Sequence, residues 1–120
     1  MIVTSRNTGR FILPKGWPIK GMSDAEAAAE EAEQEAGVTG RVAKQPIGRY
    51  RYWKRLSDSF VPITVAVFAL EVEADVQGFR EQGQRERGWL APEEAELLID
   101  DPELKSLIHD ARRLLVREEG

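Results

Sequence analysis

The sequence predicts a single α/β domain. Short stretches with strand character alternate along the chain with stretches of helical periodicity, a pattern typical of this class. The length of 120 residues fits one compact domain, and 42% hydrophobic with 32% charged residues is an ordinary globular composition. No internal repeat, low-complexity tract or linker interrupts the chain, so we expect one domain over residues 1–120.

A hairpin is expected at the start of the chain. Ile2–Thr4 and Arg10–Leu13 read as strands, and the turn residues of Arg6–Gly9 join them. Pro14 cannot continue a strand ladder because it has no backbone donor. A loop is therefore predicted from Pro14 to Met22.

The first helix has a clear start and a clear end. Ser23 and Glu26 have the spacing of a capping box, in which each side chain satisfies an exposed backbone amide of the other residue. Gly37 is a natural left-handed stop, so the helix should end near Ala36. Small residues on one side allow the helix to lie close to a sheet, namely Ala25, Ala28, Ala29, Ala32 and Ala36.

The second half of the chain is expected to hold the main strands. They are predicted at Thr39–Ala43, Ile47–Trp53, Phe60–Glu73 and Glu86–Leu90. The long apolar run of Phe60–Glu73 indicates a strand buried on both faces. Asp75–Gly83 is polar and is expected to be a loop.

Two helices are expected to close the chain. The first is predicted from Pro92 to about Ile99. Asp101 is a suitable cap for the second, which should run from about Glu103 to Arg117. Its apolar stripe consists of Leu104, Leu107, Ile108, Ala111, Leu114 and Leu115.

Composition excludes several classes of function. With no cysteine, the chain has no disulfide, no thiolate catalysis and no cysteine zinc site, which is compatible with the cytoplasmic location that we expect. We expect no membrane association, since no apolar run is long enough to span and the start has no signal-peptide layout. A formal charge of −4 gives no reason to expect nucleic-acid binding. His109, the only histidine, is predicted to lie on the surface, and no serine has the context of a nucleophile elbow.

Acidic and basic residues are separated along the chain. The predicted first helix carries the acids Asp24, Glu26, Glu30, Glu31, Glu33 and Glu35 and no base. The following ribbon carries the bases Arg41, Lys44, Arg49, Arg51, Lys54 and Arg55 and no acid. The helix could hold a cation, and the ribbon could hold the anion that this cation bridges.

Glu31 and Glu35 are the candidate metal ligands. Their spacing of four places both carboxylates on one face of the helix, one turn apart, where they can share a hard cation such as Mg²⁺ or Mn²⁺. Such a pair more often belongs to a solvated helix face, so the spacing alone is weak evidence. The preceding loop, Pro14–Gly21, brings two glycines and Lys15, which could meet a phosphate.

A wider motif gives this pair its context. Gly16, Glu31, Glu35, Gly37 and Val38 stand without insertion or deletion at the positions of the pattern G-x5-E-x7-R-E-U-x-E-E-x-G-U, where U is aliphatic. The segment Gly16–Val38 therefore resembles the box of the Nudix hydrolases. Outside it, the chain resembles the branch with diphosphoinositol-polyphosphate and diadenosine-polyphosphate hydrolases, in the segments Leu13–Pro18, Ala25–Ala29 and Arg85–Ala95.

Three positions depart from that box. Met22 replaces its first glutamate, Glu30 replaces its arginine and Gln34 replaces its penultimate glutamate. The arginine of the family is thought to orient neighbouring carboxylates, which Glu30 cannot do. Gln34 offers one neutral oxygen in place of a charged ligand. These changes could tune the site, or they could mark a protein that has stopped hydrolysing.

The resemblance implies an α/β/α sandwich with a mixed β-sheet. It implies Mg²⁺- or Mn²⁺-dependent hydrolysis of a diphosphate bond in a small phosphoanhydride, of the nucleoside or inositol polyphosphate type, with Glu31, Gln34 and Glu35 at the metal. The alternative is a weakly active or inactive module that binds a nucleotide or a protein. The chain begins where the branch usually has an earlier strand, so we expect an exposed edge that a second copy covers in a homodimer.

Other site residues are candidates of lower specificity. Glu86 is the candidate acid from outside the helix, ahead of Glu81, although Glu86 could simply pair with Arg85 or Arg87. The candidate substrate-binding residues are Arg6, Arg10, Lys15, Gly16, Lys20, Arg49, Arg51 and Lys54. Four aromatic residues could stack on a base, namely Trp17, Tyr50, Tyr52 and Trp53, but at least two of them are expected to pack in the core, as is Trp89.

Overall fold

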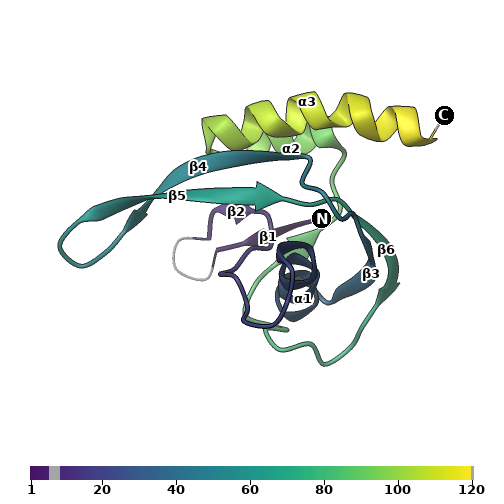
Figure 1. Cartoon of the computed structure of the whole chain (residues 1–120), viewed down its shortest axis with the longest axis horizontal. Helices are drawn as coiled ribbons and strands as arrows, with labels where there is room; N and C mark the ends of the chain where they lie inside the picture. The colour runs from purple at the N-terminus through teal and green to yellow at the C-terminus, as the bar shows by residue number, and fades with distance from the viewer. Residues whose placement is uncertain (6–8, 120) are drawn as a thin grey trace.

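The computed structural model describes residues 1–5 and 9–119, with side chains through Ala111. Its elements form three layers (Figure 1). Helices α2 (Pro92–Leu98) and α3 (Pro102–Glu119) lie on one side of the strands, and helix α1 (Asp24–Ala36) lies on the other. The predicted α/β class, with helices on both sides of the strands, is confirmed.

The strands are short and pair in antiparallel fashion. Among the described residues they form the sheets β2 (Phe11–Ile12)–β1 (Ile2–Thr4)–β7 (Arg87–Gly88), β3 (Val38–Val42)–β6 (Leu70–Asp75) and β4 (Gly48–Arg55)–β5 (Phe60–Val67). The resemblance implies one mixed sheet, whereas every described pairing is antiparallel. β1 has no edge left for a parallel neighbour, because β2 and β7 pair with its two sides. In this sheet β2 and β7 are the edge strands, so the exposed edge expected at the start of the chain does not lie on β1.

The two faces of β1 belong to two different cores. Ile2 is buried with Ile99 and Leu104 under α2 and α3. Its neighbour Val3 is buried with Ala36 and Val38 on the side of α1. Successive side chains of a strand point to opposite faces, so this short strand packs against both helical layers.

The prediction of one strand over Phe60–Glu73, buried on both faces, is wrong. This run contains β5 and β6, which pair with different partners, and Phe60 is 63% exposed. The end of the β4–β5 hairpin projects beyond the helices in Figure 1, so no layer covers it. The prediction that Trp89 packs in the core is also wrong, because β7 ends at Gly88 and Trp89 is 57% exposed.

Local signals placed the helices well. The Ser23 hydroxyl accepts from the Glu26 amide at 3.2 Å and the Glu26 carboxylate accepts from the Ser23 amide at 3.0 Å, which confirms the capping box. Gly37 ends α1 with φ of +70°. The Asp101 carboxylate accepts from the first amides of α3, as predicted for a cap. Among the described residues, no helix is both long and apolar enough to cross a membrane.

Two predicted features fall partly outside the described residues. The turn at Arg6–Gly9 lies there except for Gly9, which has φ of +70°. The stripe of α3 begins as predicted, with Leu104 and Ala111 buried and Leu107 packed against the same core. The side chains of Leu114 and Leu115 are not described.

Candidate functional site

Two carboxylates of α1 lie together near the end of the helix. Glu35 is only 3% exposed, whereas Glu31 is half-buried. Burial raises the pKa of Glu35 to about 7, and a hydrogen bond with Glu31 adds to the rise, while the charge of Arg85 opposes it. Glu35 therefore binds a proton at higher pH than an ordinary glutamate does, because it is buried beside a second carboxylate.

Arg85 supplies the positive charge that faces this pair. Its Nη2 lies 3.5 Å from Glu35 Oε1, and its Nε donates to Glu81 Oε1 at 2.9 Å. Its Nη1 donates to the backbone oxygen of Thr4 at 3.0 Å. The side chains of Arg85 and Glu81 are 10% and 13% exposed, so water screens these contacts only partly.

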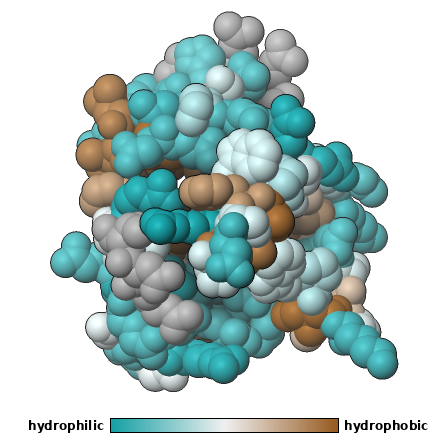
Figure 2. All heavy atoms as spheres, turned by 90° about the vertical axis from the view of Figure 1, so that its left-hand side faces the viewer, coloured by the Kyte–Doolittle hydropathy of each residue, from teal (hydrophilic) through white to brown (hydrophobic). Residues whose placement is uncertain are grey.

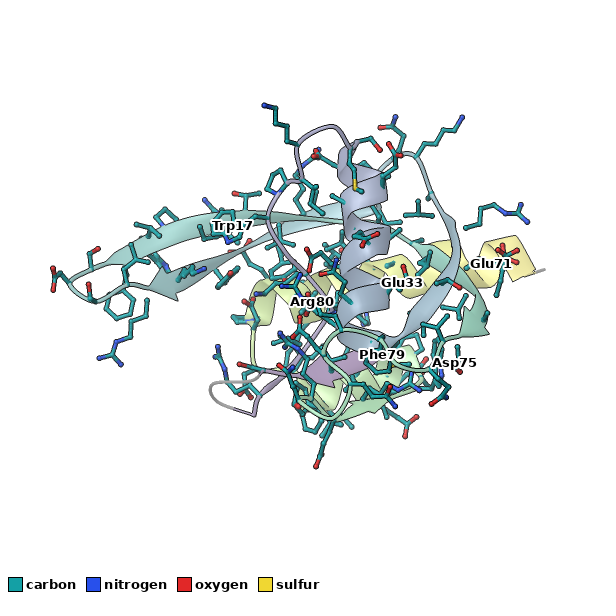
Figure 3. All side chains as sticks on the ribbon, turned by 90° about the horizontal axis from the view of Figure 1, so that it is seen from below. Trp17, Glu33, Glu71, Asp75, Phe79 and Arg80 are labelled. Carbon is teal, nitrogen blue, oxygen red and sulfur yellow. The ribbon has the colours of Figure 1, made fainter. Side chains whose placement is uncertain are left out.

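The segment between β6 and β7 wraps the end of α1. The Glu81 amide donates to the Gln34 carbonyl at 2.9 Å, and the ring of Phe79 lies against Gly37. Arg87 Nη1 donates to the Ala36 carbonyl. Figure 3 shows Phe79 and Arg80 beside this end of the helix. The last turn of α1 has no base of its own, so Arg85 of this segment and Arg87 of β7 provide the positive charge that favours a helix C-terminus.

The loop before α1 joins the acidic pair to the hairpin. Gly16 touches Glu31 so closely that an added Cβ would lie 2.4 Å from the carboxyl carbon. Lys15 Nζ lies 5.0 Å from the ring centre of Tyr52, and Lys54 Nζ lies 4.8 Å from that of Trp17. Figure 3 shows Trp17 over the hairpin. The loop thus carries one lysine, Lys15, beside Gly16, and a second lysine, Lys54 of β4, lies over Trp17, the residue after Gly16.

The other predicted bases do not all join this group. Arg49 and Arg51 are exposed, and Arg49 lines a groove of about 520 Å³ between β4 and α3, on the other side of the strands from α1. Arg51 forms an exposed ion pair with Glu103 at 3.8 Å. The remaining candidates are two exposed residues, Arg10 and Lys20, and one residue outside the described part of the chain, Arg6.

Gln34 and Glu86 are the two other residues predicted to offer an oxygen to the metal ion. The Gln34 amide nitrogen donates to Glu30 Oε1 at 2.9 Å, so these replaced box positions bind each other. Glu86 is exposed, and its backbone pairs with Thr4. Among the described residues, no three acidic, histidine or cysteine side chains are placed to hold a metal ion by themselves. A cation at α1 would therefore need oxygens from water or from a substrate as well.

The sequence pattern does not identify Arg85 as a site residue and indicates it only as a surface partner of Glu86. Arg85 is 50 residues from Glu35 in the sequence, and no periodicity links the two. The one available signal was Glu30, because an acid in place of the arginine of the box leaves the buried carboxylate without a base on its own helix.

The four aromatic candidates divide between core and surface, and the histidine lies on the surface. Tyr50 is buried and Tyr52 packs against the same core, and burial raises the pKa of Tyr50. Trp17 and Trp53 are 60% and 68% exposed. His109 lies on the surface with its Nδ1 3.0 Å from Glu96, as predicted.

Comparison with known proteins finds similarity to Nudix hydrolases. A scan against models of protein families found no match. The chain is 29% identical to Nudix hydrolase 13, mitochondrial, of Arabidopsis thaliana over 98% of its length, and 31% identical to Nudix hydrolase 12, mitochondrial, over 99%. It is 33% identical to Nudix hydrolase 16, mitochondrial, over 79%. The chain spans 61% and 64% of the first two relatives and 54% of the third.

Proposed function

We propose that this chain is a Nudix hydrolase that cleaves a diphosphate bond in a small molecule, using a divalent metal ion held at α1. The similarity to Nudix hydrolases over nearly the whole chain supports the activity class. The observation that carries the proposal is the pair of the buried Glu35 and the half-buried Glu31, at the point where Gly16 meets the helix.

The donor set fits a small hard cation. Mg²⁺ keeps several waters and commonly binds through one or two carboxylates together with substrate phosphates, so a protein site with two carboxylates is sufficient. The pKa of Glu35 is raised first by burial and then by its hydrogen bond with Glu31, and the charge of Arg85 does not cancel this rise. Glu31 and Glu35 would hold Mg²⁺ or Mn²⁺, with the Gln34 amide oxygen as a neutral addition, since only the amide nitrogen of Gln34 is bound to Glu30.

When bound, such a cation would neutralise diphosphate charge and lower the pKa of an attacking water. The other roles fall to residues of the chain. Lys15 of the loop and Lys54 of β4 are the bases best placed to hold phosphate oxygens as charge develops on them. Glu31, half-buried against Gly16, is placed to accept a proton from the attacking water. Glu81 is connected to Glu35 through Arg85, whereas Glu86 is exposed to solvent.

The test is a single substitution with a matched control. Glu35→Gln should lower metal-dependent phosphate release by on the order of 100-fold, as expected when one group that stabilises transition-state charge is lost. Glu33→Gln should leave it unchanged, since Glu33 lies on the side of α1 away from Trp17 (Figure 3). The panel comprises dinucleoside polyphosphates, nucleotide sugars and nucleoside triphosphates, each with Mg²⁺ and with Mn²⁺. Equal rates in Glu35→Gln and native protein would refute this site.

A second candidate function is an inactive module that binds a nucleotide or a protein. The bond between Glu30 and Gln34 favours it, because both replaced box positions are engaged with each other. If no substrate of the panel is cleaved by the native chain, the double substitution Glu30→Arg with Gln34→Glu discriminates further. Turnover in that variant would indicate a degraded catalytic site, and none would favour the binding module.

Location and assembly also belong to the proposal. We infer a cytoplasmic protein from the lack of cysteines, although the names of its relatives state a mitochondrial location for those proteins. A homodimer stays a prediction, and sedimentation at micromolar concentration tests it. β1 itself offers no free edge to a second copy, because β2 and β7 pair with its two sides.

A further inference from the structure

Arg85 connects three separate parts of the candidate site. Its guanidinium reaches the Thr4 carbonyl on β1, the Glu81 carboxylate on its own segment and the Glu35 carboxylate on α1. The side chain is 10% exposed, so its position is set by these contacts rather than by solvent. A guanidinium keeps its charge at any physiological pH and presents donors in a rigid planar fork, which suits it to fixing several acceptors at once.

Helix α1 cannot supply this charge itself. Its last turn contains no base, and Glu30 stands where the box pattern has an arginine. Glu30 is an acceptor and takes its hydrogen bond from the Gln34 amide. The only cation that the described residues place against Glu35 is therefore one from another element, Arg85.

We propose that Arg85 is a positioning residue that replaces the missing arginine of the box, holding the Glu35 carboxylate in the orientation in which it binds a metal ion. The inference rests on the proposed function. Glu35 Oε1 is the oxygen nearest to Arg85, which leaves the other oxygen of the carboxylate for a cation. Through Glu81 the same arginine also fixes the segment that covers the end of α1.

A purely structural role for Arg85 makes a different prediction, and Arg87 serves as its control. Arg87 is the first residue of β7, directly after this segment, and it donates to the Ala36 carbonyl and pairs with Asp75 at 2.8 Å. It therefore fastens the end of the segment to α1 as Arg85 does, but its contacts are with Ala36, Asp75 and Phe79 and not with the carboxylate pair. Loss of either arginine should loosen the segment, whereas only loss of Arg85 should change the behaviour of Glu35.

The experiment measures Mn²⁺ binding by calorimetry, kcat and KM for the full chain, at a temperature well below each variant's Tm. In Arg85→Gln, Mn²⁺ affinity and kcat should each fall by about 10–100-fold, the usual cost of losing a partner that orients a ligand, with KM almost unchanged. Arg87→Gln should lower Tm and leave Mn²⁺ affinity as in the native protein. Equal Mn²⁺ affinity in the two variants would overturn the proposal.

Two further variants keep the test decisive. If Arg85→Gln does not fold, Arg85→Lys carries the test, because one ammonium cannot orient Glu35 and Glu81 together; native Mn²⁺ affinity and kcat in Arg85→Lys would contradict the proposal. Adding Glu30→Arg to Arg85→Gln should recover Mn²⁺ affinity by about 10-fold or more if the two positions serve the same role. No recovery would contradict that replacement.

The failure of this inference is distinguishable from the failure of the proposed function. A native chain that takes up no Mn²⁺ and cleaves no substrate would refute the function, and this inference with it. Normal uptake by the native chain, together with unchanged uptake in the Arg85 variants, would refute the positioning role alone.

Discussion

Two ion pairs of similar length lie in opposite environments. Arg85 and Glu35 are 3.5 Å apart with side chains 10% and 3% exposed, whereas Arg51 and Glu103 are 3.8 Å apart with side chains 70% and 49% exposed. Distance alone would rank them alike. Water screens the Arg51–Glu103 pair and only partly screens the Arg85–Glu35 pair. The charge of Arg85 therefore acts on the ionisation of Glu35, whereas the exposed pair contributes little to stability.

The same contrast separates the two ends of the candidate site. At α1, charges are buried and fixed by contacts from β1 and from the segment between β6 and β7. On the β4–β5 hairpin they are solvated, and Figure 2 shows that end of the molecule as hydrophilic surface broken by separate apolar patches. Changes at α1 should thus affect stability and metal binding together, and changes on the hairpin should affect neither strongly.

Breaking each pair should give the largest difference. Arg85→Gln leaves Glu35 and Glu81 buried without their cation and should lower the free energy of unfolding by roughly 3–5 kcal/mol. Arg51→Gln should lower it by less than about 1 kcal/mol. Urea unfolding of metal-free protein measures both. Similar losses in the two variants would show that burial does not set the difference between these pairs.

The loop at Gly16 tests how closely the acidic pair depends on its surroundings. In Gly16→Ala the new methyl group would overlap the end of the Glu31 side chain, which is flexible and can turn away. We expect a loss of activity of up to about 100-fold, since small misplacements of reacting groups have effects of that size, with little change in Tm. Gly88→Ala is the control, because nothing lies within 4 Å of its Cβ position. An active Gly16→Ala protein would mean that Glu31 can be displaced without harm.

Features that depend on neighbouring residues were predicted correctly from the sequence, whereas features that depend on tertiary packing were not. The ends of α1 depend on neighbouring residues, Ser23 with Glu26 and the left-handed Gly37, and these were predicted correctly. The burial of the run from Phe60 depends on whether another layer covers the hairpin, which a local pattern does not contain. The α1 pair was recognisable from its spacing within the wider pattern of Gly16–Val38. Arg85 was not, because it lies just before β7 and only the folded structure brings it to Glu35. A departure such as Glu30 is thus a reason to search for a compensating charge elsewhere.

The smallest expected effect is a pH dependence of stability at the buried end. The folded pKa of Glu35 is raised from 4.5 to about 7, first by burial and then by the hydrogen bond with Glu31. Between these pH values the folded chain binds more protons than the unfolded chain, so this contribution to stability is present in full below pH 4.5 and is lost as pH rises through about 7.

Thermal unfolding of metal-free protein from pH 5 to pH 8 measures this contribution. Glu35→Gln is neutral at every pH, so its Tm should exceed that of the native protein at pH 8 by a few degrees, and the difference should shrink towards pH 5. Arg51→Gln should follow the native curve, since its pair is solvated. If the difference in Tm between the native protein and Glu35→Gln is the same at pH 5 and at pH 8, Glu35 does not titrate in this range. In that case the charge that Arg85 faces is already that of an ordinary ionised carboxylate.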